Sequence, residues 1–208
     1  MQPEIISQNQ PLSANQSHLV AALNQPELLM KRQILKLVGK KFRFFAGDQA
    51  VLFAEQKGFK MKEEIRICLD EQLQKPVIGI FARQIIDFSA KYDVVDLETN
   101  QRIGVFERKG WQSIIQDTWI VYDAWEREIG QIKEDHLILA LVRRFLSNLV
   151  PQNFDLTVGG ARTVDLKQTF NPFTYNLKIQ FMVPPEQFDR RIGLAGALLL
   201  GCIEGRQN

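Results

Sequence analysis

The sequence lacks most of the features that would mark an enzyme or a secreted protein. Two cysteines and two histidines in 208 residues supply neither a disulfide framework nor the spacing of metal ligands, which favours a reduced, intracellular protein. No Gly-x-Ser-x-Gly elbow, P-loop or zinc motif occurs. We therefore expect a non-enzymatic protein with no cofactor and no metal site.

Long hydrophobic runs and an excess of one charge are also missing. Met1–Ile6 has neither a basic nor a long apolar stretch, so no secretory signal is expected. The longest apolar run, Ile192–Ile203, is shorter than the roughly 20 residues of a membrane-spanning helix. Lys and Arg number 26 against 24 Asp and Glu, for a net charge of +2, so nucleic acid is not an expected partner. The sequence thus predicts a soluble, cytoplasmic protein, with peripheral membrane contact left open.

The chain divides once. Residues 1–26 are rich in Gln, Asn and Ser and predict a mobile N-terminal arm, with a short helical piece at Ser17–Leu23. Apolar residues make up 45% and charged residues 24% of the whole chain, which is ordinary globular composition. Residues 27–208 therefore predict one folded domain.

An internal repeat is the most informative feature present. Each unit is a strand ending in Asp, a polar turn, and a second strand that carries an apolar residue followed by Gly. The three units run from Ile65 to Arg83, Tyr92 to Arg108 and Trp119 to Lys133. Their glycines, Gly79, Gly104 and Gly130, fall 25 and 26 residues apart.

The repeat has a simple physical interpretation. Asp at a strand end can bond its own backbone two residues on and begin a turn. β-Branched and aromatic runs separated by such turns are hairpins, and hairpins in series form an antiparallel meander. Gly within a strand indicates a bulge, a bend or a close backbone approach, so three equivalent glycines predict a regularly curved sheet. A metal or phosphate site built from the Asp and Gly residues is the alternative.

The number of strands predicts closure around a filled centre. About twelve candidate strands can be counted between residues 29 and 182, and a barrel of that size is too wide for its own side chains to fill. The run Ile192–Ile203, with Leu194 and Leu198, has no polar face, as expected of a buried helix. The sequence thus predicts an all-β, closed antiparallel barrel around a central C-terminal helix. A membrane anchor is the alternative for this run.

The order of these elements resembles the tubby-like barrel superfamily, and most closely phospholipid scramblases and LURP-one-related proteins. The likeness runs from about Leu28 to Glu204, and its end is carried by Leu177–Phe181, Pro184-Pro185, Asp189-Arg190-Arg191 and Ala197–Cys202. The resemblance implies a twelve-stranded barrel around a hydrophobic helix. It also implies a lipid-related role.

Two departures from the scramblases limit what can be carried over. Their acidic calcium-binding stretch before the last helix is replaced here by Asn171–Asn176, which has no carboxylate. Their palmitoylated cysteine cluster is absent. We therefore expect peripheral binding of membrane lipid headgroups, with a soluble structural or protein-binding barrel as the alternative, and true scrambling as a third, less favoured reading.

Basic residues mark possible lipid contacts. Asp135 can cap a helix near 136–149 that carries Arg143 and Arg144, and Lys40, Lys41 and Arg43 form a second basic cluster. A basic amphipathic helix can lie on an anionic membrane surface. The alternatives are a helix that covers the barrel or fits a partner's groove, and solvated strand faces.

Overall fold

The computed structural model describes residues 13–35, 39–57, 64–83, 90–109, 118–134, 152–169 and 174–203. Helix α1 spans Ala14–Leu23 and helix α3 spans Arg190–Ile203. The strands are β1 Glu27–Leu35, β2 Gly39–Ala46, β3 Gln49–Lys57, β4 Ile65–Cys68, β5 Pro76–Ala82, β6 Ala90–Asp96, β7 Gln101–Arg108, β8 Thr118–Tyr122, β9 Glu128–Glu134, β10 Asn153–Val158, β11 Ala161–Thr169 and β12 Tyr175–Phe181.

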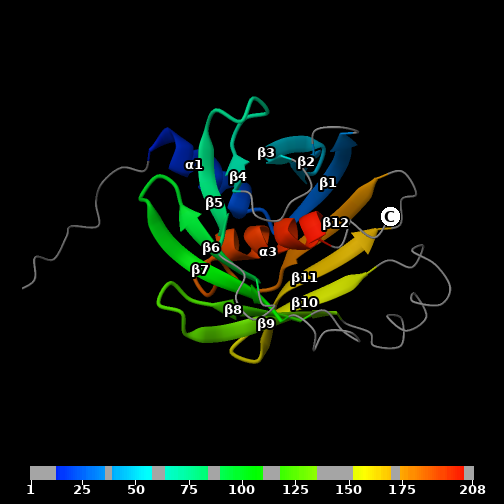
Figure 1. Cartoon of the computed structure of the whole chain (residues 1–208). Coiled ribbons are helices and arrows are strands. Elements are labelled where there is room, and N and C mark those ends of the chain that lie inside the picture. Colours follow the sequence, from blue (N-terminus) through cyan, green and yellow to red (C-terminus); the bar gives the residue numbers. More distant parts are fainter. Residues whose placement is uncertain are drawn as a thin grey trace, which may run out of the picture.

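The described strands form one closed antiparallel barrel (Figure 1). Each of the twelve pairs with its neighbour in sequence, and β1 pairs with β12 to close the sheet. The predicted all-β barrel of about twelve strands is therefore confirmed. The predicted helix near 136–149 lies outside the described residues.

The two rims of the barrel are built differently. The turns of the hairpins β2–β3, β4–β5, β6–β7, β8–β9 and β10–β11 all lie at one end, here called the hairpin rim. Because the strands alternate in direction, the connections from β3 to β4, β5 to β6, β7 to β8, β9 to β10 and β11 to β12 all leave from the other end. The hairpin rim is thus the end whose turns are described throughout.

A bulge near the start of the second strand recurs in these hairpins. One residue of that strand, close to its start, has no partner in the register, namely Val51, Val77, Ile103, Ile129 and Thr163. A bulge bends its strand and increases the local right-handed twist. Five bulges at equivalent positions explain how a long meander curves far enough to close.

The Asp residues of the repeat organise the turns before these bulges. The Asp70 carboxylate accepts the backbone N–H groups of Gln74 and Lys75. Asp96 accepts those of Glu98 and Thr99, and Asp123 accepts those of Trp125 and Arg127. Each carboxylate therefore supplies the acceptor that starts its turn.

Helix α3 occupies the centre of the barrel, as predicted (Figure 1). Leu194 and Leu198 are fully buried, at 0% exposure. Small residues let the helix lie close to the wall, because a Cβ on Gly196 would lie 2.9 Å from the Ile132 side chain. A Cβ on Gly201 would lie 2.8 Å from Met30. Among the described residues, no helix is long and apolar enough to cross a lipid bilayer.

Part of the predicted arm packs on the hairpin rim. Ser13 caps α1 through a capping box with Gln16. Leu19 and Leu23 of α1 are buried, and the Arg190 guanidinium donates hydrogen bonds to the carbonyls of Leu23 and Gln25. The described part of this segment is thus a helix whose buried leucines and following backbone contact the barrel.

Candidate functional site

The filled barrel leaves the described wall and rims as the places where function can lie. Apolar side chains of the strands and α3 form one continuous core. The Cys68 thiol is buried in the barrel wall, and burial, with Asp70 nearby, raises its pKa to about 11. It is therefore a protonated thiol and a poor nucleophile at neutral pH. Among the described residues, no group of three or more His, Cys, Asp and Glu side chains could hold a metal ion.

The structure separates the predicted lipid contacts on β2. Strand alternation places Lys40 on the inward face with Phe42 and Phe44, and only 3% of Lys40 is exposed. Its ammonium donates a 2.7 Å hydrogen bond to the Cys202 carbonyl. Lys40 is thus not a surface contact, and the alternation of the sequence could have revealed this.

Lys40 acts at the end of the central helix together with a second cation. The Arg32 guanidinium, on β1, donates a 3.1 Å bond to the Gly201 carbonyl. Cations at a helix C-terminus stabilise the last carbonyls and the helix dipole. Burial lowers the pKa of Arg32, which reflects the cost of placing this charge inside the barrel. These two residues anchor α3.

Lys41 and Arg43 point outward and join cations on neighbouring strands. Arg43 lies directly opposite Lys31 of β1, and Lys41 lies opposite Gln33. Lys178 of β12 lies opposite Leu29. Leu29 is two residues before Lys31 in β1 and faces outward with it. We call the outward side chains of Lys31, Lys41, Arg43 and Lys178 the basic face. Arg143 and Arg144 lie outside the described residues.

The basic face carries apolar groups as well as charges. The Lys31 ammonium lies 4.6 Å from the centre of the Phe45 ring, in cation–π geometry. Arg43 pairs with Glu71 at 2.5 Å and Lys178 with Glu27 at 2.6 Å. All four of these paired side chains are at least 38% exposed, so the pairs are weak.

Sequence reasoning missed Lys31 and Lys178. Lys31 has only the inward-facing Arg32 beside it in β1, and Lys178 is the one cation of β12, so neither stands out as part of an exposed basic cluster in the sequence. Only the pairing of β1 with both β2 and β12 brings them beside Arg43. Their outward alternation was the one signal available in the sequence.

A second charged cluster lies on the outside of β5–β9 and is internally satisfied. Arg83 donates to Asp93 and Glu126, and Arg102 contacts the same two carboxylates. Hydrogen bonds from Arg83 lower the pKa of Glu126. Because the charges are matched within the cluster, we assign it to the stability of the wall rather than to chemistry.

The repeat glycines each lie at a close approach, though to different neighbours. A Cβ on Gly130 would lie 1.9 Å from the Thr157 carbonyl oxygen of β10. On Gly79 it would lie 2.5 Å from the Phe81 ring, and on Gly104 it would lie 3.1 Å from the Tyr122 carbonyl oxygen. The carboxylates and glycines of the repeat thus have structural roles in turns and strand contacts.

Neither a scan against models of protein families nor a search of curated proteins finds a match to this chain. The class of the protein therefore comes from its architecture. It is a closed, twelve-stranded antiparallel barrel filled by a C-terminal helix, and this is consistent with a tubby-like fold.

Proposed function

We propose that this chain is a tubby-like barrel protein related to phospholipid scramblases and LURP-one-related proteins. We further propose that it is a non-enzymatic, cytoplasmic domain that binds anionic membrane headgroups peripherally. The basic face supplies the contact in this proposal. The support for it is the arrangement of charges described above, together with the resemblance of the sequence.

The observation that carries the proposal is the like-charge pair of Lys31 and Arg43. Side chains directly opposite on neighbouring antiparallel strands have Cβ atoms about 4.5–5.5 Å apart, and like charges there are destabilising. Lys41 lies on the same outward face of β2. A phosphate group beside these cations would turn their repulsion into attraction, so an anionic surface is the partner that this face favours.

The expected binding is weak and dependent on salt. A Lys or Arg near an anionic leaflet contributes about 1 kcal/mol, and the effect falls off within a Debye length. Glu71 and Glu27 offset part of the contribution of Arg43 and Lys178. Leu29 and Phe45, both partly buried, lie on the same outward face and offer apolar contact at the headgroup level.

Scrambling would require more than this surface. The central helix would have to leave the barrel, which would expose its buried leucines and remove the carbonyl partners of Arg32 and Lys40. Binding to the outer wall needs no such change. We therefore propose headgroup binding without lipid transport.

Co-sedimentation with vesicles tests the proposal. The full chain should bind vesicles that contain phosphatidylserine or a phosphoinositide, should bind neutral phosphatidylcholine vesicles far less, and should dissociate at high salt. Lys31→Gln with Lys41→Gln should weaken binding roughly thirtyfold, since two cations are lost. Arg66→Gln with Arg127→Gln is the matched control, because it removes two exposed cations from elsewhere on the barrel, one on β4 and one in the turn between β8 and β9.

Equal loss in both double variants would contradict the basic face as the contact. Binding to neutral vesicles that is as tight as binding to anionic vesicles would contradict the electrostatic mechanism. Arg143→Glu with Arg144→Glu tests the predicted helix near 136–149. If this helix contacts the membrane, the charge reversal should lower binding to anionic vesicles. Absence of vesicle binding by the wild-type chain would favour a soluble, protein-binding barrel.

A further inference from the structure

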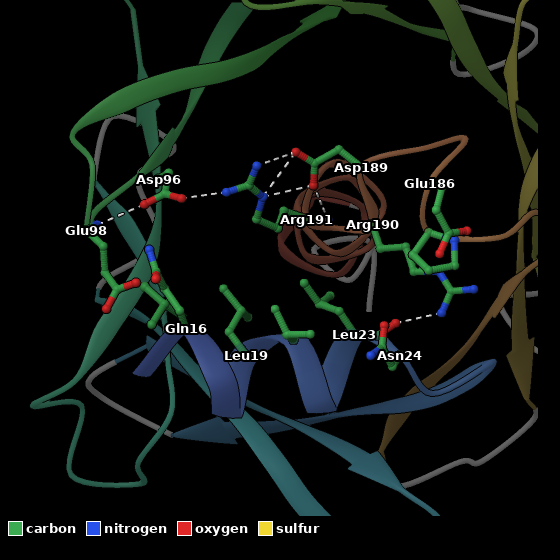
Figure 2. Close-up of a pocket in the computed structure, with 13 residues that line it drawn as sticks. Gln16, Leu19, Leu23, Asn24, Asp96, Glu98, Glu186, Asp189, Arg190 and Arg191 are labelled. Carbon is green, nitrogen blue, oxygen red and sulfur yellow. Dashed lines mark hydrogen bonds and ion pairs between the residues drawn. The ribbon is translucent and has the colours of Figure 1, made fainter. Parts of the chain in front are cut away.

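A cavity of about 540 Å³ lies on the hairpin rim, between α1 and the start of α3 (Figure 2). Its volume falls within the roughly 300–1,000 Å³ of typical small-molecule sites. Its walls come from α1, from β5 and the end of β6, and from the segment that leads into α3. The helix α1, the paired strands β5 and β6, and the segment before α3 are far apart in sequence, and they come together at this rim.

One side of the cavity is apolar. Leu19, Val20 and Leu23 of α1 line it, and Val77 at the start of β5 contributes from the barrel. Figure 2 shows Leu19 and Leu23 pointing from the helix into the space. An apolar body of a ligand would therefore replace water along this wall, which favours binding.

The opposite side is a chain of ion pairs. The Arg191 guanidinium lies between Asp189 and Asp96, with Nε 2.9 Å from one Asp189 oxygen and 3.0 Å from the other. The hydrogen bonds that Arg191 donates to the Asp189 carboxylate raise the pKa of Arg191, so this group stays charged. One guanidinium between two carboxylates leaves the trio with a net charge of −1.

The second arginine of the wall, Arg190, donates its hydrogen bonds to backbone carbonyls. Arg190 donates to the carbonyls of Leu23, Gln25 and Val183, and it forms no ion pair among the described residues. Its guanidinium also lies 4.6 Å from the centre of the Phe181 ring. It holds α1, β12 and α3 together, and it is therefore a support of the cavity.

Two exposed carboxylates flank the cavity in Figure 2, on opposite sides of the view. Glu98 accepts a 2.6 Å hydrogen bond from the Ser13 hydroxyl, and within the described part of the chain neither Glu98 nor Glu186 has a cation within 4.0 Å. With Asp96, Asp189 and the two arginines, the lining carries four carboxylates against two guanidinium groups. The cavity is thus amphipathic, with a net charge of −2.

We propose that this cavity binds a small organic cation with an apolar body, of the class of aliphatic primary ammonium compounds. The apolar wall takes the hydrocarbon, and an ammonium group at either end reaches Glu98 or Glu186. A neutral analogue loses the ionic contact, and an anionic analogue meets repulsion. The same chemistry is offered by a free amine and by the lysine side chain of a peptide.

This site does not depend on the proposed lipid function. Its residues differ from those of the basic face, and it selects the opposite charge. Vesicle binding and amine binding can therefore fail separately, so the two proposals are distinguishable.

Titration of the full chain with hexylammonium tests the site. Calorimetry and ligand-observed saturation-transfer NMR measure the binding. Hexylammonium should bind roughly fivefold more tightly than hexanol, because one carboxylate at about 4 Å from the ammonium contributes about 1 kcal/mol in water, and hexanoate should not bind. Butylammonium should bind more weakly than hexylammonium, since it covers less of the apolar wall. Glu98→Gln with Glu186→Gln should abolish the preference for the cation.

Glu128→Gln with Asp48→Asn is the matched control, because it removes two exposed carboxylates elsewhere and changes the net charge equally. Affinity for hexylammonium should be unchanged in this variant. Equal binding of hexanol, equal loss in the control, or no binding of hexylammonium at millimolar concentration would each overturn the proposal. A lysine peptide with blocked termini distinguishes the sources: tighter binding than hexylammonium indicates a peptide, and weaker binding indicates a free amine.

Discussion

Glycine at the third repeat is required by the backbone of the next strand. A Cβ added at Gly130 would meet the carbonyl oxygen of Thr157, and this oxygen is fixed by the pairing of β9 with β10. At Gly79 the nearest atoms belong to the far end of the Phe81 ring, which can rotate. The same residue type thus serves two different constraints.

We predict that Gly130→Ala destabilises the fold by about 2 kcal/mol or more, because a strand would have to shift. Gly104→Ala, at a 3.1 Å contact, should cost less, about 1 kcal/mol. The free energies of unfolding from urea titrations measure both. Gly79→Val, Gly104→Val and Gly130→Val all behaving as neutral would refute the structural role of the repeat glycines.

The buried Cys68 thiol predicts a dependence of stability on pH. Burial raises its folded-state pKa to about 11, so folding favours the protonated thiol. This contribution is complete below the unfolded pKa of about 8.5–9 and is lost as the pH rises toward the folded value. The wild-type chain should lose about 1 kcal/mol more stability than Cys68→Ala between pH 8 and pH 10.

Cys68→Ala is the control for this prediction, because it differs from the wild-type chain only in lacking the thiol. Urea titrations of the two chains at both pH values give the difference. A parallel loss in the two chains would mean that the thiol titrates as in the unfolded state. Slow reaction of native Cys68 with a thiol reagent at neutral pH should accompany the predicted difference.

At the scale of elements, the central helix and the wall depend on each other. The helix supplies buried leucines that the barrel cannot provide, and the barrel supplies Arg32 and Lys40 for the last carbonyls of the helix. At the other end, the Asp189 carboxylate accepts the N–H of Arg191. A negative group at the N-terminus and positive groups at the C-terminus both suit the helix dipole.

We predict that Leu198→Asp prevents folding, because an unpaired carboxylate would be buried at a site with 0% exposure. Leu198→Ala should fold but lose about 2–5 kcal/mol, as expected for a large-to-small change in a core. Met182→Asp, at 47% exposure, is the control and should be nearly neutral. Circular dichroism and thermal melts measure the three variants, and a folded Leu198→Asp chain would contradict the central position of α3.

At the scale of the whole molecule, several of the described aspartates are engaged in turns and ion pairs. Asp70, Asp96 and Asp123 accept backbone N–H groups, and Asp165 pairs with Lys167 at 2.7 Å. None of these arrangements gathers the several oxygen ligands that calcium requires. The sequence Asn171–Asn176 adds no carboxylate to them.

We therefore predict that calcium neither binds at micromolar concentration nor shifts the melting temperature. Isothermal titration and melts with calcium or with a chelator measure this directly. Magnesium is the control for a nonspecific effect of a divalent cation. Micromolar calcium binding would revive a scramblase-like mechanism for this chain.

The sequence by itself determined the strands, their hairpins and the apolar helix. These features are local, because alternation, Asp-initiated turns and an all-apolar run are each written within a few consecutive residues. The inward position of Lys40 is also a local feature, because strand alternation places Lys40 on the same face as Phe42 and Phe44. Its inward position was therefore available without the structure.

Only the tertiary structure decided which distant residues meet. The closing pair of β1 with β12 brings Lys178 beside the cations of β1 and β2, and the packing of α1 on the hairpin rim brings Glu98 and Glu186 to one cavity. Both depend on barrel closure and on contacts across most of the chain. Local patterns cannot specify such pairings, because many registers and helix positions would satisfy the same alternation of apolar and polar residues.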